Sequence, residues 1–432
     1  MSDPHIAPAD LAGWLQYIEA QHPKSIAMGL ERVREVSQRL NLNPIFPVIT
    51  VGGTNGKGSA CAMLESIYQQ AGYRVACYTS PHLLRYNERV RVNSVEATDE
   101  ELSAAFAAVE LARTSLEQPV PLTYFEFGTL AAIWHFMQAE VDVAILEVGL
   151  GGRLDAVNAF EPSCAIVTSV DMDHMDFLGN TRESIGYEKA GIYRAGTTAI
   201  CGDLDPPQSL LKHALAIGAD LKQSGRNFDF AEEEGGWVYK DDKTVIRDLP
   251  KPALTGNFQR YNAACVLAAI SAMQSRLPIN QAQIAQGLRS VRLPGRFQQV
   301  SNSPQVILDV AHNPHAAIAL ADNLTHAPCG GRTIAVFGML ADKDIAGVIE
   351  VLQSQIDDWY VSDIQHPRGA AADQLAENLR RIAPASSLHL YRDITMAYRQ
   401  ACNDAAENDR IIVFGSFFTV ADVMRVLPAI PH

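Results

Sequence analysis

A glycine-rich segment that begins at Val48 has the residue types of a phosphate-binding loop. It reads Val48-Ile-Thr-Val-Gly-Gly-Thr-Asn-Gly-Lys-Gly-Ser59, and a helical pattern follows it from Ala60 to Gln70. Glycines let the backbone fold tightly around phosphate oxygens, the first turn of the helix offers N–H groups, and Lys57 supplies a cation. A tight strand-to-helix connection without a ligand is the alternative, which the placed lysine and the strong strand disfavour. The expected phosphate contacts are Thr54, Asn55, Gly56, Lys57, Gly58 and Ser59.

Two side chains that follow other apolar strands can add a metal ion to such a site. Glu147 ends the run Val143-Ala-Ile-Leu-Glu147, and a carboxylate at a strand end beside a phosphate loop commonly meets Mg2+. His174 comes shortly after another expected strand, Cys164–Val170. Because Mg2+ prefers oxygen ligands, residue type alone favours a surface or core role for this histidine.

Three further charged residues have both an ordinary and a functional interpretation. Lys189 lies between helical residues and would ordinarily be a solvated cation. Arg296 follows a Pro-Gly turn, where its planar fork suits either a phosphate group or a salt bridge at a domain boundary. Asp309 ends the strand that starts at Val306, where its carboxylate can accept hydrogen bonds from ribose hydroxyls.

Apolar strands that alternate with helical stretches must position these residues. Continuous apolar strands of this kind are typical of parallel sheets covered on both faces, so the fold class is α/β. A first series of strands is expected at Phe46–Gly52, Arg74–Thr79, Val141–Val148, Cys164–Val170 and Thr198–Gly202. A second series is expected at Val306–Val310, Thr333–Gly338, Trp359–Ser362 and Ile411–Phe414.

Two features subdivide this α/β chain. The stretch from about Leu221 to Leu254 has short alternating segments and turn residues, which predict a small antiparallel hairpin insertion. The turn Leu293-Pro-Gly-Arg296 precedes the second strand series. We therefore expect a large nucleotide-binding α/β domain over residues 1–293 and a smaller Rossmann-like domain over residues 294–432, with the site in the cleft between them.

The composition disfavours several classes of protein. The chain has 432 residues, 47% of them hydrophobic, and a net charge of −14, which argues against nucleic acid or an anionic membrane as the main partner. It has neither an apolar run of bilayer length nor a secretory pattern at the N-terminus, so we expect a cytoplasmic protein. The seven cysteines are scattered without a CxxC pair, which disfavours a disulfide framework or a zinc site.

Short blocks in a fixed order indicate a family. Gly53-Thr-Asn-Gly-Lys-Gly-Ser59 resembles the ATP loop of the Mur ligase superfamily, and specifically of its folate branch. The other blocks that match in family order are Thr79-Ser-Pro-His-Leu83, Leu146-Glu-Val-Gly-Leu-Gly-Gly-Arg-Leu-Asp-Ala156, Asp173-His174 with Leu178-Gly179, Glu188-Lys-Ala-Gly-Ile192, Pro294-Gly-Arg296, Asp309-Val-Ala-His-Asn-Pro314, Phe337-Gly-Met-Leu-Ala-Asp-Lys-Asp344 and Gly415-Ser-Phe-Phe-Thr419. Agreement at so many ordered blocks excludes chance.

The resemblance implies roles for individual residues around ATP. The positions that match magnesium ligands, for one or two ions, are Ser80, Glu147 and His174. Beyond the glycine-rich loop, the positions that match ATP contacts are Asn262, Arg296 and Asp309. The implied catalytic residues are Lys57, His174, Arg296 and Lys189, the last as a carbamate. A carbamate forms when a neutral amine adds CO2, so the pKa of this lysine must fall from its usual value of about 10.4.

The same resemblance implies a pterin site made of three segments. Its residues are Ala27, Met28 and Gly29; Thr123, Tyr124, Phe125 and Glu126; and Leu154, Asp155 and Ala156. Tyr124 and Phe125 can stack on a flat ring, although aromatic residues at a helix start are more often core. Asp155 can accept hydrogen bonds from the ring. Bifunctional members of the branch often carry an acidic residue where this chain has Ala27.

The implied activity is that of an ATP-dependent amide ligase. An acceptor carboxylate attacks the γ-phosphorus of ATP, and the amine of L-glutamate then displaces phosphate from the acyl phosphate. The implied acceptors are dihydropteroate and tetrahydrofolate with its polyglutamates, and a monofunctional folylpolyglutamate synthase is the alternative. A Mur-type ligase for a peptidoglycan precursor, a P-loop switch and a nucleotide-binding structural subunit are the rival classes. Because the sequence has no heptad pattern, we expect a monomer.

Overall fold

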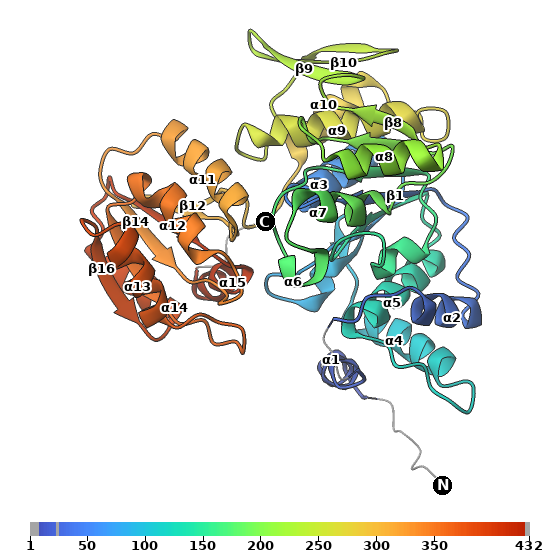
Figure 1. The fold of residues 1–432 in the computed structure, drawn as a ribbon, viewed down its shortest axis with the longest axis horizontal. Coiled ribbons are helices and arrows are strands. Elements are labelled where there is room, and N and C mark those ends of the chain that lie inside the picture. The colour runs from blue at the N-terminus through green and yellow to red at the C-terminus, as the bar shows by residue number, and fades with distance from the viewer. Residues whose placement is uncertain (1–7, 23–25, 428–432) are drawn as a thin grey trace. The chain divides into compact units, whose positions relative to one another are not determined.

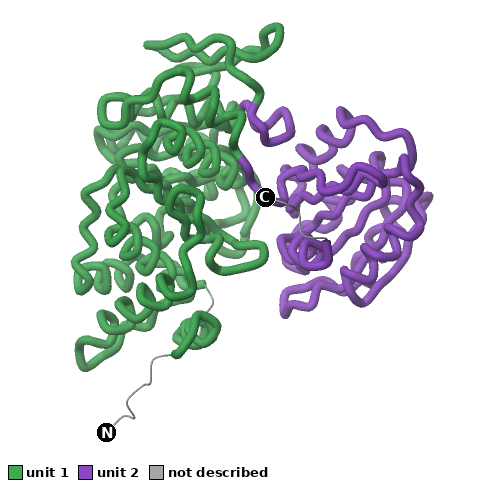
Figure 2. The backbone as a smooth tube through the Cα atoms, turned by 180° about the vertical axis from the view of Figure 1, so that it is seen from behind, with its two compact units in different colours: residues 1–251, 261–291 green, residues 252–260, 292–432 purple. Residues whose placement is uncertain are grey.

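The computed structural model describes residues 8–22 and 26–427, and these form two compact units (Figure 2). Unit 1 consists of the described residues of 1–251 and 261–291, and unit 2 of those of 252–260 and 292–427. The short segment Pro252–Arg260 groups with unit 2, where Asn257 Nδ2 donates to Asp322 Oδ2 at 2.9 Å. The chain therefore passes between the units at three places.

Unit 1 is built on an eight-stranded sheet in the order β4-β3-β2-β5-β1-β6-β7-β8 (Figure 1). The pairs from β2 through β8 along this order are parallel, and β3 and β4 add an antiparallel edge. The central strands are continuously buried, as the apolar runs predicted. Their bounds are β1 (Val48–Gly52), β2 (Val75–Tyr78), β3 (Val90–Val92), β4 (Val95–Glu96), β5 (Val143–Glu147), β6 (Cys164–Val167), β7 (Thr198–Cys201) and β8 (Asp220–Gln223).

Helices of unit 1 begin where the sequence supplies capping residues. Thr98, Thr123 and Thr181 each accept the N–H of the residue three positions ahead and so start α4, α5 and α7. The helices are α1 (Leu11–Glu19), α2 (Glu31–Arg39), α3 (Lys57–Gln70), α4 (Asp99–Arg113), α5 (Tyr124–Gln138), α6 (Met175–Leu178), α7 (Arg182–Ala190), α8 (Gln208–Ile217), α9 (Phe258–Met273) and α10 (Gln281–Ser290), with short 3-10 turns at Tyr86–Arg89 and Ala156–Ala159.

The predicted antiparallel insertion is a three-stranded sheet rather than a single hairpin. Its strands are β9 (Phe228–Glu233), β10 (Gly236–Asp241) and β11 (Val245–Leu249), in the order β11-β10-β9. The buried side chains of Trp237 and Tyr239 anchor it, and Trp237 Nε1 donates to Pro250 O at 2.8 Å. The insertion also starts later than expected, because Leu221 belongs to the edge strand β8 of the main sheet.

Unit 2 has a six-stranded sheet in the order β12-β13-β17-β14-β15-β16, parallel except for β12. Phe337, Trp359 and Phe414 from neighbouring strands contact one another in its core, mostly edge to face. The strands are β12 (Gln298–Asn302), β13 (Gln305–Leu308), β14 (Thr333–Phe337), β15 (Asp358–Ser362), β16 (Ser387–Tyr391) and β17 (Arg410–Phe414). The helices are α11 (Pro314–His326), α12 (Ile345–Leu352), α13 (Ala372–Ile382), α14 (Ile394–Asp404) and α15 (Phe417–Val426), with a 3-10 turn at Gln353–Gln355. The predicted α/β class is confirmed.

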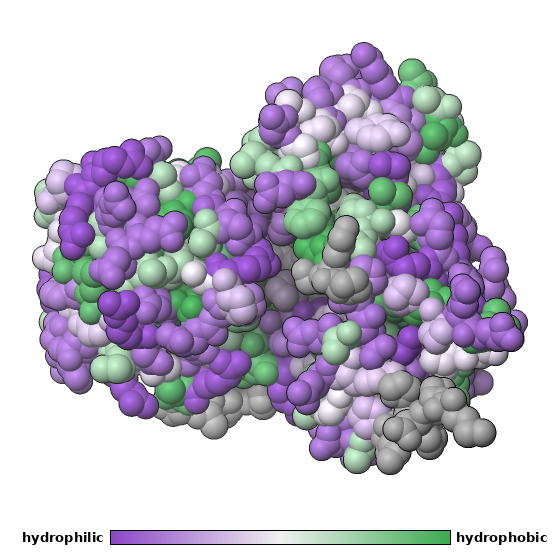
Figure 3. All heavy atoms as spheres, turned by 60° about the horizontal axis from the view of Figure 1, so that its bottom comes forward, coloured by the Kyte–Doolittle hydropathy of each residue, from purple (hydrophilic) through white to green (hydrophobic). Residues whose placement is uncertain are grey.

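Exposed large hydrophobic residues are spread along the described chain, from Ile45 to Phe418. On the face shown in Figure 3, hydrophilic residues predominate and hydrophobic ones lie among them. Within residues 8–22 and 26–427, no helix combines the length and the apolar character that a membrane span needs.

Candidate active site

The glycine-rich loop joins β1 to α3, and two of its glycines permit contacts that a side chain would block. Gly56 has a φ of +88°, and a Cβ atom there would lie 2.4 Å from Asn262 Oδ1. A Cβ atom at Gly53 would lie 1.9 Å from Thr168 Oγ1. Lys57 Nζ donates to the carbonyl of Gly53 at 2.9 Å and so closes the turn on itself. The fold thus brings Asn262, predicted from a distant segment, against the phosphate loop.

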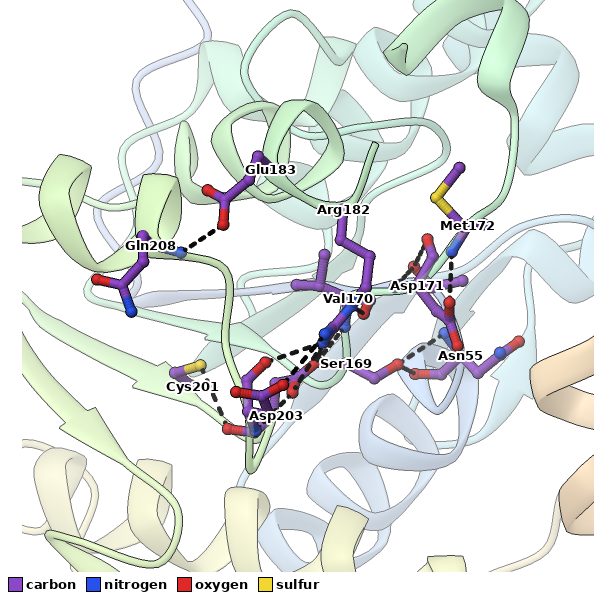
Figure 4. Close-up of polar contacts among 12 residues, drawn as sticks. Asn55, Ser169, Val170, Asp171, Met172, Arg182, Glu183, Cys201, Asp203 and Gln208 are labelled. Carbon is purple, nitrogen blue, oxygen red and sulfur yellow. Dashed lines mark hydrogen bonds and ion pairs between the residues drawn. The ribbon is translucent and has the colours of Figure 1, made fainter. Parts of the chain in front are cut away.

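The segment 168–174, which follows β6, is bonded to the phosphate loop through its first half. Ser169 accepts the N–H of Thr54 on its carbonyl at 2.8 Å and the N–H of Asn55 on its hydroxyl at 3.1 Å (Figure 4). Thr54 Oγ1 donates to Asp171 O at 3.0 Å and accepts the Asp171 N–H at 2.9 Å. The N–H groups of Thr54 and Asn55 therefore bind protein atoms, whereas the N–H groups in the first turn of α3 lack intrahelical acceptors.

Two of the three predicted metal ligands meet at neighbouring strand ends. Glu147 ends β5 and is buried, and its Oε2 accepts the N–H of Ser80 at 3.1 Å. Ser80 follows β2, the strand that pairs with β5. His174 ends the 168–174 segment as the N-cap of α6 in a left-handed conformation (φ 50°), with its N–H donating to Asp173 Oδ1 at 2.9 Å.

The donor set fits magnesium rather than a metal held by protein alone. In the part of the chain that the structure describes, no cluster of three or more His, Cys, Asp or Glu side chains could hold an ion. Mg2+ commonly takes one or two carboxylates and obtains its other ligands from substrate phosphates and water. A buried Glu147 at the end of a strand that pairs directly with β1 fits that pattern.

Lys189 lies in the last turn of α7 and is 4% exposed. Its pKa is lowered to about 7, chiefly by burial and also by the Lys57 ammonium, while the carboxylates of Asp173 and Asp155 act in the opposite direction. None of the described residues makes a hydrogen bond to its amine. A buried amine that is substantially neutral near pH 7 meets the chemical requirement for adding CO2.

Unit 2 holds Arg296 and Asp309 next to each other. Asp309 Oδ2 accepts the N–H of Phe297 at 2.8 Å and Oδ1 accepts the N–H of Ala311 at 2.8 Å, which fixes the carboxylate at the end of β13. Burial raises the pKa of Asp309, and the guanidinium of Arg296 opposes that rise. Arg296 Cζ lies 5.3 Å from the ring centre of Phe417, a cation–π contact from the start of α15 that sequence reasoning missed.

Two of the three predicted pterin segments of unit 1 are joined by Arg32, a residue that the sequence did not single out. Its guanidinium donates to Glu126 Oε1 at 2.7 Å and to the carbonyl of Ala27 at 2.7 Å. Glu126 is 3% exposed, and its other oxygen accepts the N–H of Thr123. The Glu126 carboxylate therefore binds protein groups and organises the segment, and Ala27 contributes its backbone carbonyl.

The third pterin segment is organised by Asp155. Its carboxylate accepts the N–H groups of Leu150 at 2.8 Å and Val157 at 3.1 Å, and burial raises its pKa to about 7. Glycines nearby let apolar side chains approach: a Cβ atom at Gly149 would lie 2.7 Å from the ring of Phe125. Gly29 N–H donates to Leu154 O at 3.4 Å, so the three predicted segments lie together.

Comparison with known proteins shows to which family the chain belongs. The family of the Mur ligase middle domain matches residues 121–270, and the family of the Mur ligase glutamate ligase domain matches residues 295–417. These two matches identify residues 121–270 and 295–417 as Mur ligase domains.

Relatives in the folate branch match the chain over nearly its whole length. The Escherichia coli dihydrofolate synthase/folylpolyglutamate synthase is 47% identical over 98% of this chain and 97% of its own. The structure of Escherichia coli FolC in complex with DHPP and ADP has 46% identity and a TM-score of 0.91, covering 97% of this chain and 98% of that one. A structure of a bifunctional folylpolyglutamate synthase/dihydrofolate synthase with Mn, AMPPNP and L-glutamate bound has 46% identity and a TM-score of 0.89 over the same shares. The chain belongs to the dihydrofolate synthase/folylpolyglutamate synthase family, which confirms the resemblance drawn from the motifs.

Proposed function

We propose that this chain is an ATP-dependent ligase that adds L-glutamate to dihydropteroate and to tetrahydrofolate and its polyglutamates. The observation that carries the proposal is the full-length similarity to an enzyme whose structure contains DHPP and ADP. The joined pterin segments and the phosphate loop of unit 1 support it from this chain's own geometry.

The reaction needs charge stabilisation more than a dedicated base. The acceptor carboxylate attacks the γ-phosphorus of ATP, ADP leaves, and the neutral amine of L-glutamate then forms the amide bond as phosphate leaves. Lys57 and Arg296 stabilise charge on the transferred phosphoryl group, and the first turn of α3 binds phosphate oxygens through its N–H groups. Most of the rate acceleration comes from positioning the reactants.

The nucleotide contacts that we assign are the phosphate loop (Thr54, Asn55, Gly56, Lys57, Gly58 and Ser59) together with Asn262, Arg296 and Asp309. Ser80, Glu147 and His174 would hold one or two Mg2+ ions, which neutralise phosphate charge when bound. Asn262 is supported by its contact with Gly56, and the pair of Ser80 and Glu147 by its hydrogen bond.

We also propose that Lys189 is carbamylated in the active enzyme. The carbamate would convert a buried amine into an anion that lies near Lys57 and can orient the ligands of a metal. The burial of Lys189 and its lack of a hydrogen-bond acceptor among the described residues support this assignment.

The acceptor site that we propose consists of the segments Ala27–Gly29, Thr123–Glu126 and Leu154–Ala156. Phe125 and Met28 supply apolar surface, since both pack against glycines of residues 149–152. The alternative is a monofunctional folylpolyglutamate synthase, which the alanine at position 27 keeps open. We further propose that the enzyme is cytoplasmic, in keeping with its seven unpaired cysteines. We also propose that it is a monomer.

One assay tests the proposal against its rivals. ADP release is measured with dihydropteroate, tetrahydrofolate or a muramyl peptide precursor as acceptor, each with and without L-glutamate. We expect glutamate-dependent turnover with the first two acceptors. Turnover only with the muramyl precursor, or ADP release that never requires an amino acid, would contradict the proposal.

A further inference from the structure

The segment 168–174 connects two parts of the proposed nucleotide site. Its first residues bind Thr54 and Asn55 of the phosphate loop, and His174 ends it. Val170 lies in the middle, with its side chain buried in the core of unit 1. The position of the Val170 backbone therefore determines how the two ends of the segment are placed.

Two charged side chains hold both peptide groups of Val170 (Figure 4). Asp203 Oδ2 accepts the Val170 N–H at 2.8 Å, and Arg182 Nε donates to the Val170 carbonyl at 3.0 Å. The two side chains also bind each other, because Arg182 Nη2 lies 3.3 Å from each oxygen of Asp203. The same nitrogen donates to Asp205 O at 2.9 Å, which ties the pair to the chain after β7.

The two residues occupy positions from which they can couple several elements. Arg182 is the first residue of α7, the helix that carries Lys189 in its last turn, and Asp203 follows β7. The Asp203 side chain is only 11% exposed, so its charged hydrogen bond to Val170 is weakly screened by water. His174 keeps a left-handed backbone, which a residue with a Cβ adopts only where its surroundings hold it.

We propose that Arg182 and Asp203 are positioning residues for the nucleotide site. They fix the 168–174 segment to the start of α7, so that the phosphate loop, His174 and Lys189 keep one arrangement before ATP arrives. The inference rests on the proposed function, because His174 and Lys189 have their roles only in such a ligase.

The test compares Asp203→Ala and Arg182→Met with Glu183→Gln as the control. Glu183 is the next residue of α7, and its carboxylate accepts N–H groups at the start of α8, at Gln208 and Ser209. The readouts are amide hydrogen exchange of residues 168–174 in the ligand-free protein, the Kd for ADP, and the magnesium concentration that gives half-maximal ligation.

We expect faster exchange in the 168–174 segment, and a Kd for ADP and a magnesium requirement both raised about tenfold, in the two test variants. The KM for dihydropteroate should change less than about twofold, because the hydrogen bonds of the pair go to Val170 and Asp205 and not to the pterin segments. A loss of stability alone would not affect the Kd for ADP and the KM for dihydropteroate so differently. Arg182→Lys should restore little, since a single ammonium group cannot serve Val170, Asp203 and Asp205 together.

The inference is wrong if Asp203→Ala leaves the exchange of 168–174 and the ADP affinity equal to those of Glu183→Gln. Should Asp203→Ala fail to fold, Asp203→Asn answers the same question, since it keeps an acceptor oxygen but loses the charge that pairs with Arg182. A wild-type protein that ligates no glutamate would overturn the proposed function, while exchange and ADP affinity would still decide the role of the pair.

Discussion

The phosphate loop and the pterin segments both belong to unit 1, but different bonds hold them in place. The phosphate loop depends on glycines and on backbone hydrogen bonds from the 168–174 segment. The pterin segments depend on carboxylates, with Arg32 and Glu126 joining two of them and Asp155 organising the third. Both acceptors react at the same ATP site, so substitutions on the nucleotide side should slow both reactions equally. Substitutions on the acceptor side should slow one reaction more than the other.

The largest loss is expected from Glu147→Gln. Removing the carboxylate charge should lower kcat/KM for both acceptors by roughly a thousandfold, because a metal ligand contributes several kcal/mol to the transition state. The amide oxygen can still accept the Ser80 N–H, so Tm should stay near that of the wild type. Kinetics across a magnesium titration check the effect, with the exposed Glu161→Gln as the control. Ordinary turnover at ordinary magnesium would remove Glu147 from the site.

The next largest effect is expected from Lys189→Ala, about a hundredfold on both reactions, since the anion that the carbamate supplies is lost. Added acetate should restore part of the activity by occupying the vacated space. In the wild type, the neutral fraction of the amine rises as the pH increases through about 7. Stimulation by bicarbonate should therefore be stronger at about pH 8 than at about pH 6. Carbon-13 NMR after labelling with bicarbonate checks the modification, and an unmodified amine in the active, metal-bound enzyme would refute it.

On the acceptor side, Asp155→Ala should slow dihydrofolate synthesis ten- to a hundredfold more than polyglutamylation, the cost of one charged hydrogen bond. The pKa of Asp155 lies at about 7, so its carboxylate becomes protonated as the pH falls through that value. The KM for dihydropteroate should therefore rise below about pH 7 in the wild type and lose this dependence in Asp155→Asn. Asp142→Asn is the matched control, since Asp142 accepts the N–H of Arg74 at the other end of β5. Equal losses with both acceptors would argue against a pterin contact.

The smallest effect is expected from Arg32→Met, about a tenfold rise in the KM for dihydropteroate with the KM for ATP unchanged. The reason is that the guanidinium joins the Ala27 carbonyl to Glu126 without holding the nucleotide. Arg39→Met controls for general loosening, because Arg39 lies on the same helix and donates to the carbonyls of Ala112 and Arg113. A similar change in both variants would mean that Arg32 has a structural role only.

The sequence predicted the features that lie within one contiguous segment and missed those that depend on partners far along the chain. Apolar runs located the buried central strands, because a strand covered on both faces must be continuously hydrophobic. They missed the edge strands β4, β8, β12 and β16, and β3 beside β4, whose residues are largely exposed or half-buried and carry no such pattern. The glycine-rich loop could also be located, because the strand, the turn residues and the helical pattern that mark it lie in one contiguous segment.

The side-chain pairs of the site could not be predicted in this way. Arg32 and Glu126 are 94 positions apart, and Arg182 and Asp203 are 21 apart. Each looks like an ordinary surface charge until the fold brings its partner close, and neither pair has a spacing rule. The pterin segments were accessible only through the resemblance to a family, because no local pattern marks a loop that binds a flat ring.

The most direct test of the account follows oxygen from the acceptor to phosphate. Dihydropteroate and tetrahydrofolate are each labelled with oxygen-18 in the reacting carboxylate and incubated with the enzyme, ATP and L-glutamate. If both acceptors form an acyl phosphate at one ATP site, the released phosphate carries one labelled oxygen in each reaction. Unlabelled phosphate in either reaction, or no turnover of dihydropteroate, would contradict the account.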